Sequence, residues 1–152
     1  MSDRPKLPYT NATLHEIQRI QTSIPISVPH ATYDDMYIDG KLIPKNTILL
    51  CSLTSVHRDT KAWDEPNKFK PERFLDHDGN FRPRKEFCAF SYGPRQCIGK
   101  QLAEAEVFLI FVAIVQRFKL SKSKPDQRLS LEGIQTFATF DPIPYEMKFE
   151  LM

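Results

Sequence analysis

The sequence predicts one mainly α-helical domain with small β-sheets. Apolar residues recur at helical intervals in two stretches, 10–22 and 99–117. Short runs of β-branched, aromatic or alternating apolar residues, bounded by turn residues, predict brief strands at 36–43, 47–53, 135–140 and 145–151. The length of 152 residues is enough for one ordinary domain with a buried core.

Composition narrows the classes of protein and of partner. The formal net charge is only +2 at pH 7, so no strongly basic field favours nucleic acid. Hydrophobic residues make up 41% of the chain, which argues against long disorder and against a membrane bundle. The longest uncharged apolar run, 107–115, gives a helix of about 14 Å, whereas a bilayer core is about 30 Å thick. Three cysteines without a CxxC pair, after a polar start, favour a reducing compartment.

In the first part of the chain we predict one helix and a few short strands. The helix at about 10–22 contains a match to the capping box, Thr13-Leu14-His15-Glu16, and Pro25 ends it. Asp39-Gly40 is a favoured two-residue turn, which predicts a hairpin over 36–43. A β-branched, leucine-rich run at 47–53 predicts another strand.

The rest of the chain begins with irregular structure. Between residues 59 and 90 the periodicity fades, and prolines and turn residues recur. A loop region of that length inside a domain is usually functional. The helix at 99–117 is apolar on more than one face, so we expect it to be deeply buried. Two strands, 135–140 and 145–151, should follow, separated by two prolines.

Three motifs indicate chemistry only weakly. Residues 15–19 begin like the helix of a zinc protease, but Arg19 stands where a second histidine ligand is required. Asn11-Ala12-Thr13 is a glycosylation sequon in a chain without other secretory features. The basic cluster at 119–128 is explained by a solvated turn after a helix.

An ion-pair latch is a stronger hypothesis. Glu16 and Arg19 lie one helical turn apart, and alone such a pair is usually a weak surface interaction. The irregular region offers a second arginine, Arg73, within Pro71-Glu72-Arg73-Phe74. A Glu16 carboxylate held between two guanidinium groups would form a rigid structural latch.

The strongest functional signal is the segment of residues 90–99, which precedes the long helix. A lone cysteine is most often a small buried hydrophobe. Cys97, however, lies where the free N–H groups of a helix N-terminus stabilise negative charge, and the thiolate is the form that binds metals. Gly93 allows the positive φ that would fold the loop beneath a flat ligand. Arg95 is placed to meet an anionic group near a metal, and Gly99 leaves room where helix and ligand approach.

These residues resemble the cytochrome P-450 family, the haem-thiolate monooxygenases. The fixed positions of the family's F-x-x-G-x-R-x-C-x-G loop are matched by Phe90, Gly93, Arg95, Cys97 and Gly99. The Glu16/Arg19 pair and the 71–74 segment lie upstream, in the family's order. The stretch 24–30 is similar to the animal microsomal branch that oxidises drugs and fatty acids. The resemblance implies that residues 1–152 are the C-terminal portion of a single monooxygenase domain, which is incomplete here.

The resemblance also implies roles for single residues. Cys97 would be the catalytic residue and the axial thiolate ligand of the iron, with heme b (iron protoporphyrin IX) as the cofactor. Arg95 and His30 would contact the haem propionates, and Phe90, Gly93 and Gly99 would complete the cofactor site. Glu16, Arg19 and Arg73 would form the structural latch. The substrate pocket would be lined by Ile24, Val28, Phe137 and Ala138.

The implied reaction inserts one oxygen atom from O₂ into a lipophilic organic substrate, with electrons from an NADPH-dependent flavoprotein reductase. The reductase should dock on a basic face formed by Arg82, Arg84, Lys85 and Lys100. The family resides at the endoplasmic reticulum membrane, and this sequence lacks the anchor. Two alternatives stay open. One is a truncated haem-binding or non-folding chain without catalytic activity, and the other is a zinc or redox module, although Cys88 and Cys97 lack partners at ligand spacing.

Overall fold

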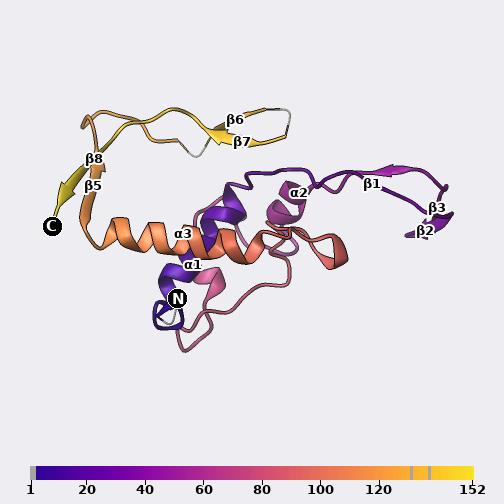
Figure 1. Cartoon of the computed structure of the whole chain (residues 1–152), viewed down its shortest axis with the longest axis horizontal. Coiled ribbons are helices and arrows are strands. Elements are labelled where there is room, and N and C mark those ends of the chain that lie inside the picture. Colours follow the sequence, from indigo (N-terminus) through magenta and orange to yellow (C-terminus); the bar gives the residue numbers. More distant parts are fainter. Residues whose placement is uncertain (1–2, 131, 137) are drawn as a thin grey trace.

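Three α-helices run through the part of the chain that the computed structural model describes, residues 3–130, 132–136 and 138–152 (Figure 1). They are α1 (Pro8–Ile20), α2 (Leu53–Arg58) and α3 (Lys100–Val115). A short 3-10 helix, η1 (Arg4–Lys6), precedes α1, and two more, η2 (Pro71–Phe74) and η3 (Gly93–Arg95), lie between α2 and α3.

The named strands of these described residues pair two at a time, always antiparallel. The pairs are β1 (His30–Ala31) with β4 (Ile48–Leu49), β2 (Met36–Ile38) with β3 (Lys41–Ile43), β5 (Phe118–Lys122) with β8 (Met147–Leu151), and β6 (Gly133–Gln135) with β7 (Phe140–Pro142). The expected small sheets are present. The expectation of a mainly helical chain holds only in part, because helices share it with these sheets and with long irregular segments.

The core lies where α1 packs against η2 and the irregular segment 59–90. Its fully buried centre consists of Ala12, Trp63 and Phe74, and partly buried neighbours surround it: Ala62, Leu75, Phe81 and Phe87. The irregular course of 59–90 agrees with the prediction, with η2 as its one short helical turn among the described residues. Helix α1 therefore packs against an irregular segment and not against a β-sheet.

The N-terminal end of α1 differs from the prediction. The helix begins at Pro8, whose fixed φ and missing N–H suit a first turn, so Thr13 lies inside the helix and caps nothing. The sequon residue Asn11 is buried, and its side chain accepts from Arg4 Nε at 2.7 Å and donates to the Arg4 carbonyl at 2.8 Å. The amide of Asn11 therefore serves packing.

The hairpin prediction is confirmed and the next strand prediction is partly wrong. Asp39 and Gly40 have φ values of 48° and 75°, as the predicted two-residue turn requires. The predicted strand 47–53 shrinks to β4, and Leu53 opens α2. The hydroxyl oxygen of Ser52 accepts the N–H of Ser55 at 3.2 Å, an N-cap interaction that favours the helix over continued pairing.

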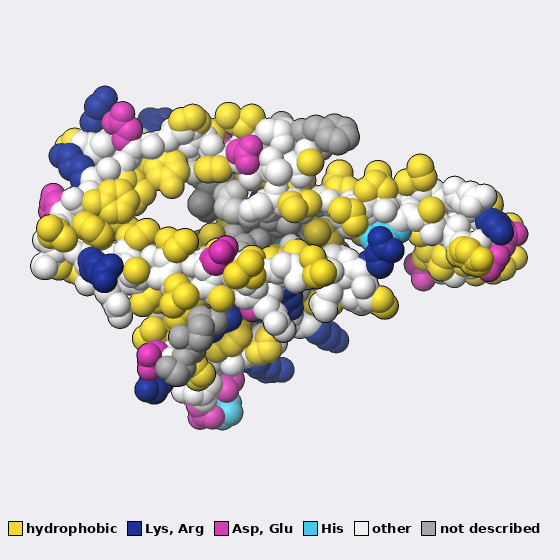
Figure 2. All heavy atoms as spheres, viewed as in Figure 1, with side chains coloured by type: hydrophobic (Ala, Val, Ile, Leu, Met, Phe, Trp, Pro, Cys, Tyr) yellow, Lys and Arg dark blue, Asp and Glu magenta, His cyan; other side chains and the backbone are white. Residues whose placement is uncertain are grey.

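The expectation that α3 is deeply buried is wrong for this chain. Phe108 is buried, but apolar side chains on the other faces are exposed: Leu102, Val107, Leu109, Ile110 and Val115. Figure 2 shows hydrophobic side chains spread over the surface of this helix. The physical reason is that α1 and β5, its main partners here, cover only part of its circumference. Among the described helices none combines the length and the apolar character needed to cross a bilayer.

The C-terminal strands are more numerous than predicted. The stretch expected to form one strand at 135–140 contributes to two, β6 and β7, which pair with each other. The strand expected at 145–151 is present as β8, and its partner β5 occupies part of the basic stretch interpreted as a solvated turn. The Phe140 N–H donates to the Ser23 carbonyl at 2.8 Å, which attaches β7 to the segment after α1.

Candidate functional site

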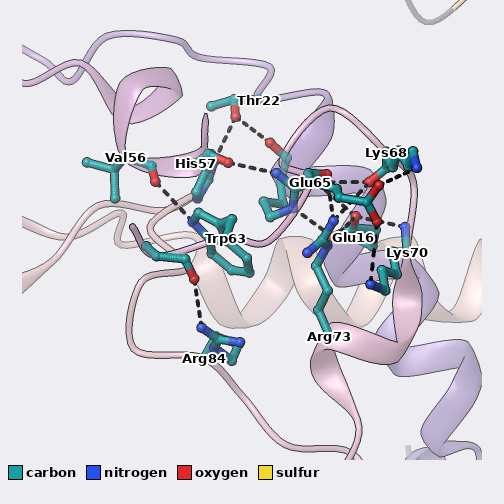
Figure 3. Close-up of polar contacts among 12 residues, drawn as sticks. Glu16, Thr22, Val56, His57, Trp63, Glu65, Lys68, Lys70, Arg73 and Arg84 are labelled. Carbon is teal, nitrogen blue, oxygen red and sulfur yellow. Dashed lines mark hydrogen bonds and ion pairs between the residues drawn. The ribbon is translucent and has the colours of Figure 1, made fainter. Parts of the chain in front are cut away.

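The structure brings Glu16, Arg19 and Arg73 together (Figure 3). Arg19 forms a two-pronged pair with the Glu16 carboxylate, Nε to Oε2 at 2.7 Å and Nη2 to Oε1 at 2.8 Å. Arg73 Nε reaches Oε1 at 3.3 Å, and the backbone N–H of Lys70 donates to the same oxygen at 2.9 Å. The side chains of Glu16 and Arg19 are 0% exposed and that of Arg73 is 5% exposed. This is a buried, charge-assisted network with four donors on one carboxylate.

Arg19 also ties this network to α2 and to the aromatic core. Its Nη1 donates to the His57 carbonyl at 2.7 Å, and its guanidinium lies over the Trp63 ring, 5.1 Å from the ring centre. Arg84 lies over the same ring at 5.0 Å and donates to the Ala62 carbonyl at 3.0 Å. One arginine therefore joins α1, α2 and the irregular segment.

The cysteine segment folds as a closed loop ahead of α3. Gly93 has a φ of 75°, the left-handed conformation that glycine adopts without strain. The Cys97 N–H donates to the Phe90 carbonyl at 2.9 Å, which closes the loop, and Gly99 is the N-cap residue of α3. The thiol of Cys97 is exposed. A side-chain carbon added at Gly99 would meet only the Cys97 sulfur, at 3.9 Å, so the chain's own packing does not require a glycine there.

A largely apolar cavity of about 420 Å³ opens beside this loop. Its walls include Cys97, Arg95 and Phe90 from the loop, together with Ile24 and Val28 from the segment after α1. The other lining residues are Gln18, Gln21, Ser23, Ser27, Leu53, Ala89, Ser91 and Ile98. Its volume falls in the range of small-molecule sites, about 300–1,000 Å³.

Some predicted site residues lie away from this cavity. His30 is paired with Leu49 in the β1–β4 sheet, and neither His30 nor Ala138 is among the described residues that line the cavity. Phe137, predicted to line the substrate pocket, lies outside the described residues. Five residues predicted for the cofactor or substrate site therefore line the cavity, and four described ones do not: Gly93, Gly99, His30 and Ala138.

The predicted basic face surrounds a second, more polar groove of about 960 Å³. Arg84, Lys85 and Lys100 line it, whereas Arg82 is exposed outside its walls. Arg84 is already engaged, because its Nε pairs with Glu86 at 3.2 Å. Of the four predicted residues, the two lysines line the groove without an ion pair to a described residue.

A protein-only metal centre is not formed by the described residues, since no three His, Cys, Asp or Glu side chains gather there. Cys88 is buried, and its sulfur faces His57 Nε2 at 3.5 Å. Burial raises the pKa of the Cys88 thiol, which makes this cysteine a poor thiolate donor. The alternative of a zinc module therefore has no set of zinc ligands among the described residues.

Two residues that contact the latch and the loop, Lys70 and His57, are not predicted from the sequence. The backbone N–H of Lys70 reaches Glu16 across 54 positions, and His57 contacts Thr22 and Cys88 across 35 and 31 positions. No spacing rule marks such partners, because neither repeats at a helical or strand interval. Their positions follow only from the course of the irregular segment.

Comparison with known proteins gives one consistent result. The family model described as Cytochrome P450 matches residues 1–149. The chain belongs to the cytochrome P450 family. It is 42% identical over 147 residues to cytochrome P450 2D4 of the rat, Rattus norvegicus, with 97% of this chain and 29% of that protein covered. Cytochrome P450 2J3 of the rat is 40% identical over the same length, and cytochrome P450 2D15 of the dog, Canis lupus familiaris, is 41% identical over 150 residues.

The chain spans about 29% of the length of the rat cytochrome P450 proteins it matches. The exposed apolar faces of α3 are consistent with that coverage, since a helix that is apolar on more than one face requires cover on more than one side.

Proposed function

We propose that this chain supplies the thiolate side of the haem site in a monooxygenase, as the C-terminal portion, residues 1–152, of a single domain. The enzyme would insert one oxygen atom of O₂ into a lipophilic organic substrate, with two electrons from a reductase. The observation that carries the proposal is the cavity where Cys97, Arg95 and Phe90 meet Ile24 and Val28.

The residues around this cavity fit a haem group. The walls are mainly apolar, as a flat macrocycle requires, and the exposed Cys97 would be the iron ligand there. Arg95 makes no side-chain hydrogen bond or ion pair with the described residues, so its guanidinium is available to a propionate. When bound, heme b would supply the activation of O₂.

Some side chains of the chain would then hold the cofactor, and others would hold the loop in position. Cys97 would keep its sulfur toward the iron, and Phe90 would keep water from that sulfur. Gly99 would admit the macrocycle close to the start of α3, where an added side-chain carbon meets little of the protein. His30 would reach a propionate only if the group extends from the cavity toward β1. Glu16, Arg19 and Arg73 would act as structure and not as acid–base catalysts.

The substrate side of the proposal rests on the segment after α1. Ile24 and Val28 are half-exposed or more, at 52% and 62%, and both face the cavity. Apolar side chains in this position favour a lipophilic substrate. We also propose the endoplasmic reticulum membrane as the location of the whole protein, as for the microsomal branch that the sequence resembles.

Replacing Cys97 with Ser tests the proposal. Residues 1–152 replace the matching region of full-length rat cytochrome P450 2D4, and this chimaera is loaded with haem. We expect the reduced, CO-treated protein to show a thiolate-type absorption band, and we expect Cys97→Ser to abolish it completely, because a hydroxyl does not supply the thiolate. Cys51→Ser is the matched control, since Cys51 is also exposed. Retention of the band in Cys97→Ser would reject the assignment, and a normal band without product formation would favour the non-catalytic alternative.

Charge reversal at Lys85 and Lys100 tests the proposed docking of an acidic reductase. We expect the double variant Lys85→Glu/Lys100→Glu to be reduced more slowly, on the order of ten-fold at low salt, because electrostatic steering raises association rates. The salt dependence should become flatter, since exposed charges are screened over about 8 Å at physiological ionic strength. Arg84 is left unchanged because it packs on Trp63. Lys41→Glu/Lys119→Glu, at two exposed strand positions, is the control. Equal rates and salt slopes in both double variants would exclude docking at this groove.

A further inference from the structure

We infer that His57 is a positioning residue, whose uncharged imidazole joins the end of α1 to the start of the cysteine loop by a hydrogen bond on each side. The inference deepens the proposed function and rests on it, because His57 would hold in position the loop that carries Cys97. His57 belongs to α2 and is 0% exposed. It lies outside the cavity walls formed by the described residues, so it would act through other groups.

The hydrogen bonds define which ring nitrogen carries the proton. The backbone N–H of Cys88 can only donate, and it points at His57 Nε2 from 2.9 Å, so Nε2 accepts. The proton of the neutral ring therefore resides on Nδ1, which lies 2.8 Å from the Thr22 hydroxyl oxygen. That hydroxyl in turn donates to the Arg19 carbonyl at 3.0 Å. Each hydrogen bond thus pairs one donor with one acceptor, and the Thr22 hydroxyl both accepts from Nδ1 and donates to the Arg19 carbonyl.

His57 is also connected to Arg19, a member of the latch. Arg19 Nη1 donates to the His57 carbonyl at 2.7 Å, while Thr22 connects the His57 ring to the Arg19 carbonyl. Arg19 and His57 are therefore linked twice, once through the His57 backbone and once through its ring. The ring also stacks on Phe87, with centres 5.5 Å apart and planes 18° apart, and meets Trp63 edge-on. These contacts leave the imidazole little freedom to turn.

From Cys88 the connection continues to the proposed iron ligand. The Cys88 carbonyl accepts the Ser91 N–H at 2.8 Å, and the next carbonyl but one, that of Phe90, accepts the Cys97 N–H at 2.9 Å. A shift of Cys88 would displace both acceptors. The geometry therefore makes the loop's position depend on the acceptor at His57 Nε2.

The electrostatic surroundings support a ring that stays neutral. Burial and the nearby Arg19 cation lower the pKa of His57 to about 4, against a smaller opposing effect of Glu16. From the loop, the Cys88 thiol faces Nε2 at 3.5 Å, and burial raises the pKa of that thiol, so it adds no negative charge. A proton on Nε2 would point at the Cys88 N–H, donor against donor.

The test compares three variants of the 152-residue chain. His57→Phe keeps the ring shape and removes both hydrogen bonds, whereas His57→Gln can restore an acceptor toward Cys88. Thr22→Val removes only the partner on the α1 side. In His57→Phe we expect amide hydrogen exchange at Cys88 and Cys97 to quicken at least ten-fold relative to amides in the middle of α1. His57→Gln should recover most of the protection, and Thr22→Val should give an intermediate effect.

Two further measurements keep the inference open to rejection if His57→Phe does not fold. Nitrogen NMR of the wild-type chain at pH 7 should show a neutral His57 ring with the proton on Nδ1, and a proton on Nε2 or a charged ring overturns the inference. In the haem-loaded chimaera with the rat P450, His57→Gln should keep the thiolate-type band longer on storage than Thr22→Val, and the reverse order also overturns the inference. Equal exchange in all variants, or a uniform acceleration that includes α1, also overturns it. Failure of the Cys97→Ser test would instead reject the iron site and leave these exchange results unaffected.

Discussion

Replacing Arg19 with Met is expected to lower the free energy of unfolding by about 3–5 kcal/mol, since removing one partner strands a buried charge. The Arg19 side chain is 0% exposed and holds both oxygens of Glu16 as well as the His57 carbonyl. Methionine fills a similar volume but supplies no donor. Because domains are stabilised by only about 5–15 kcal/mol in total, this loss is a large fraction of the whole stability of the fold.

Urea unfolding followed by far-ultraviolet circular dichroism measures this loss. Arg82→Met is the matched control, because the Arg82 side chain is exposed outside the latch and its backbone N–H remains to donate to the Phe74 carbonyl. The control should stay within about 0.5 kcal/mol of wild type. If Arg19→Met and Arg82→Met unfold at the same urea concentration, the latch contributes nothing measurable, and its four donors only balance the cost of burying the charges.

Acidification is expected to destabilise the chain strongly between pH 6.5 and about 4. The pKa of His57 is about 4 in the folded chain against an ordinary value of 6.5, so the unfolded chain binds the proton more readily over this interval. Stability from this group is therefore complete above pH 6.5, falls as the pH drops, and levels off below about 4. The difference corresponds to roughly 3 kcal/mol. Burial lowers the pKa of His15 as well, so its contribution has the same sign.

Urea midpoints measured at several pH values separate His57 from the carboxylates that also titrate. The slope of stability against pH should become shallower in His57→Gln, because that side chain carries no titrating proton. His77→Gln is the matched control, since the His77 side chain is 89% exposed and should leave the slope unchanged. Parallel slopes in wild type and His57→Gln would show that the imidazole does not resist protonation in the folded chain.

The sequence predicted those parts of the molecule that depend on local chemistry. The Asp39-Gly40 turn needs only its own two residues, and the helix before Pro25 needs only its apolar spacing. The meeting of Arg73 with Glu16 over 57 positions is different, because no local spacing joins the two residues; its prediction rests on a second arginine in the irregular segment and on the order of motifs in the family. The loop with Cys97 was recognisable for the same reason.

The errors have two kinds of physical cause, local competition between elements and dependence on partners distant in sequence. The short α2 competes with a strand, and one serine hydroxyl at Ser52 favours the helix. Burial of α3 cannot be judged from its own composition, because cover is a property of neighbours. His57 was overlooked because an isolated histidine carries no pattern, and its value lies in the two groups that it joins.

Trp63 gives this chain a built-in optical reporter. It is the single tryptophan, 1% exposed, with its indole N–H on the Val56 carbonyl at 3.0 Å and the cations of Arg19 and Arg84 over its ring. The intrinsic fluorescence on tryptophan excitation therefore originates at one point, directly beside the latch. A shift of emission to longer wavelength, with easier quenching by acrylamide, would time the opening of that point separately from the melting of α3.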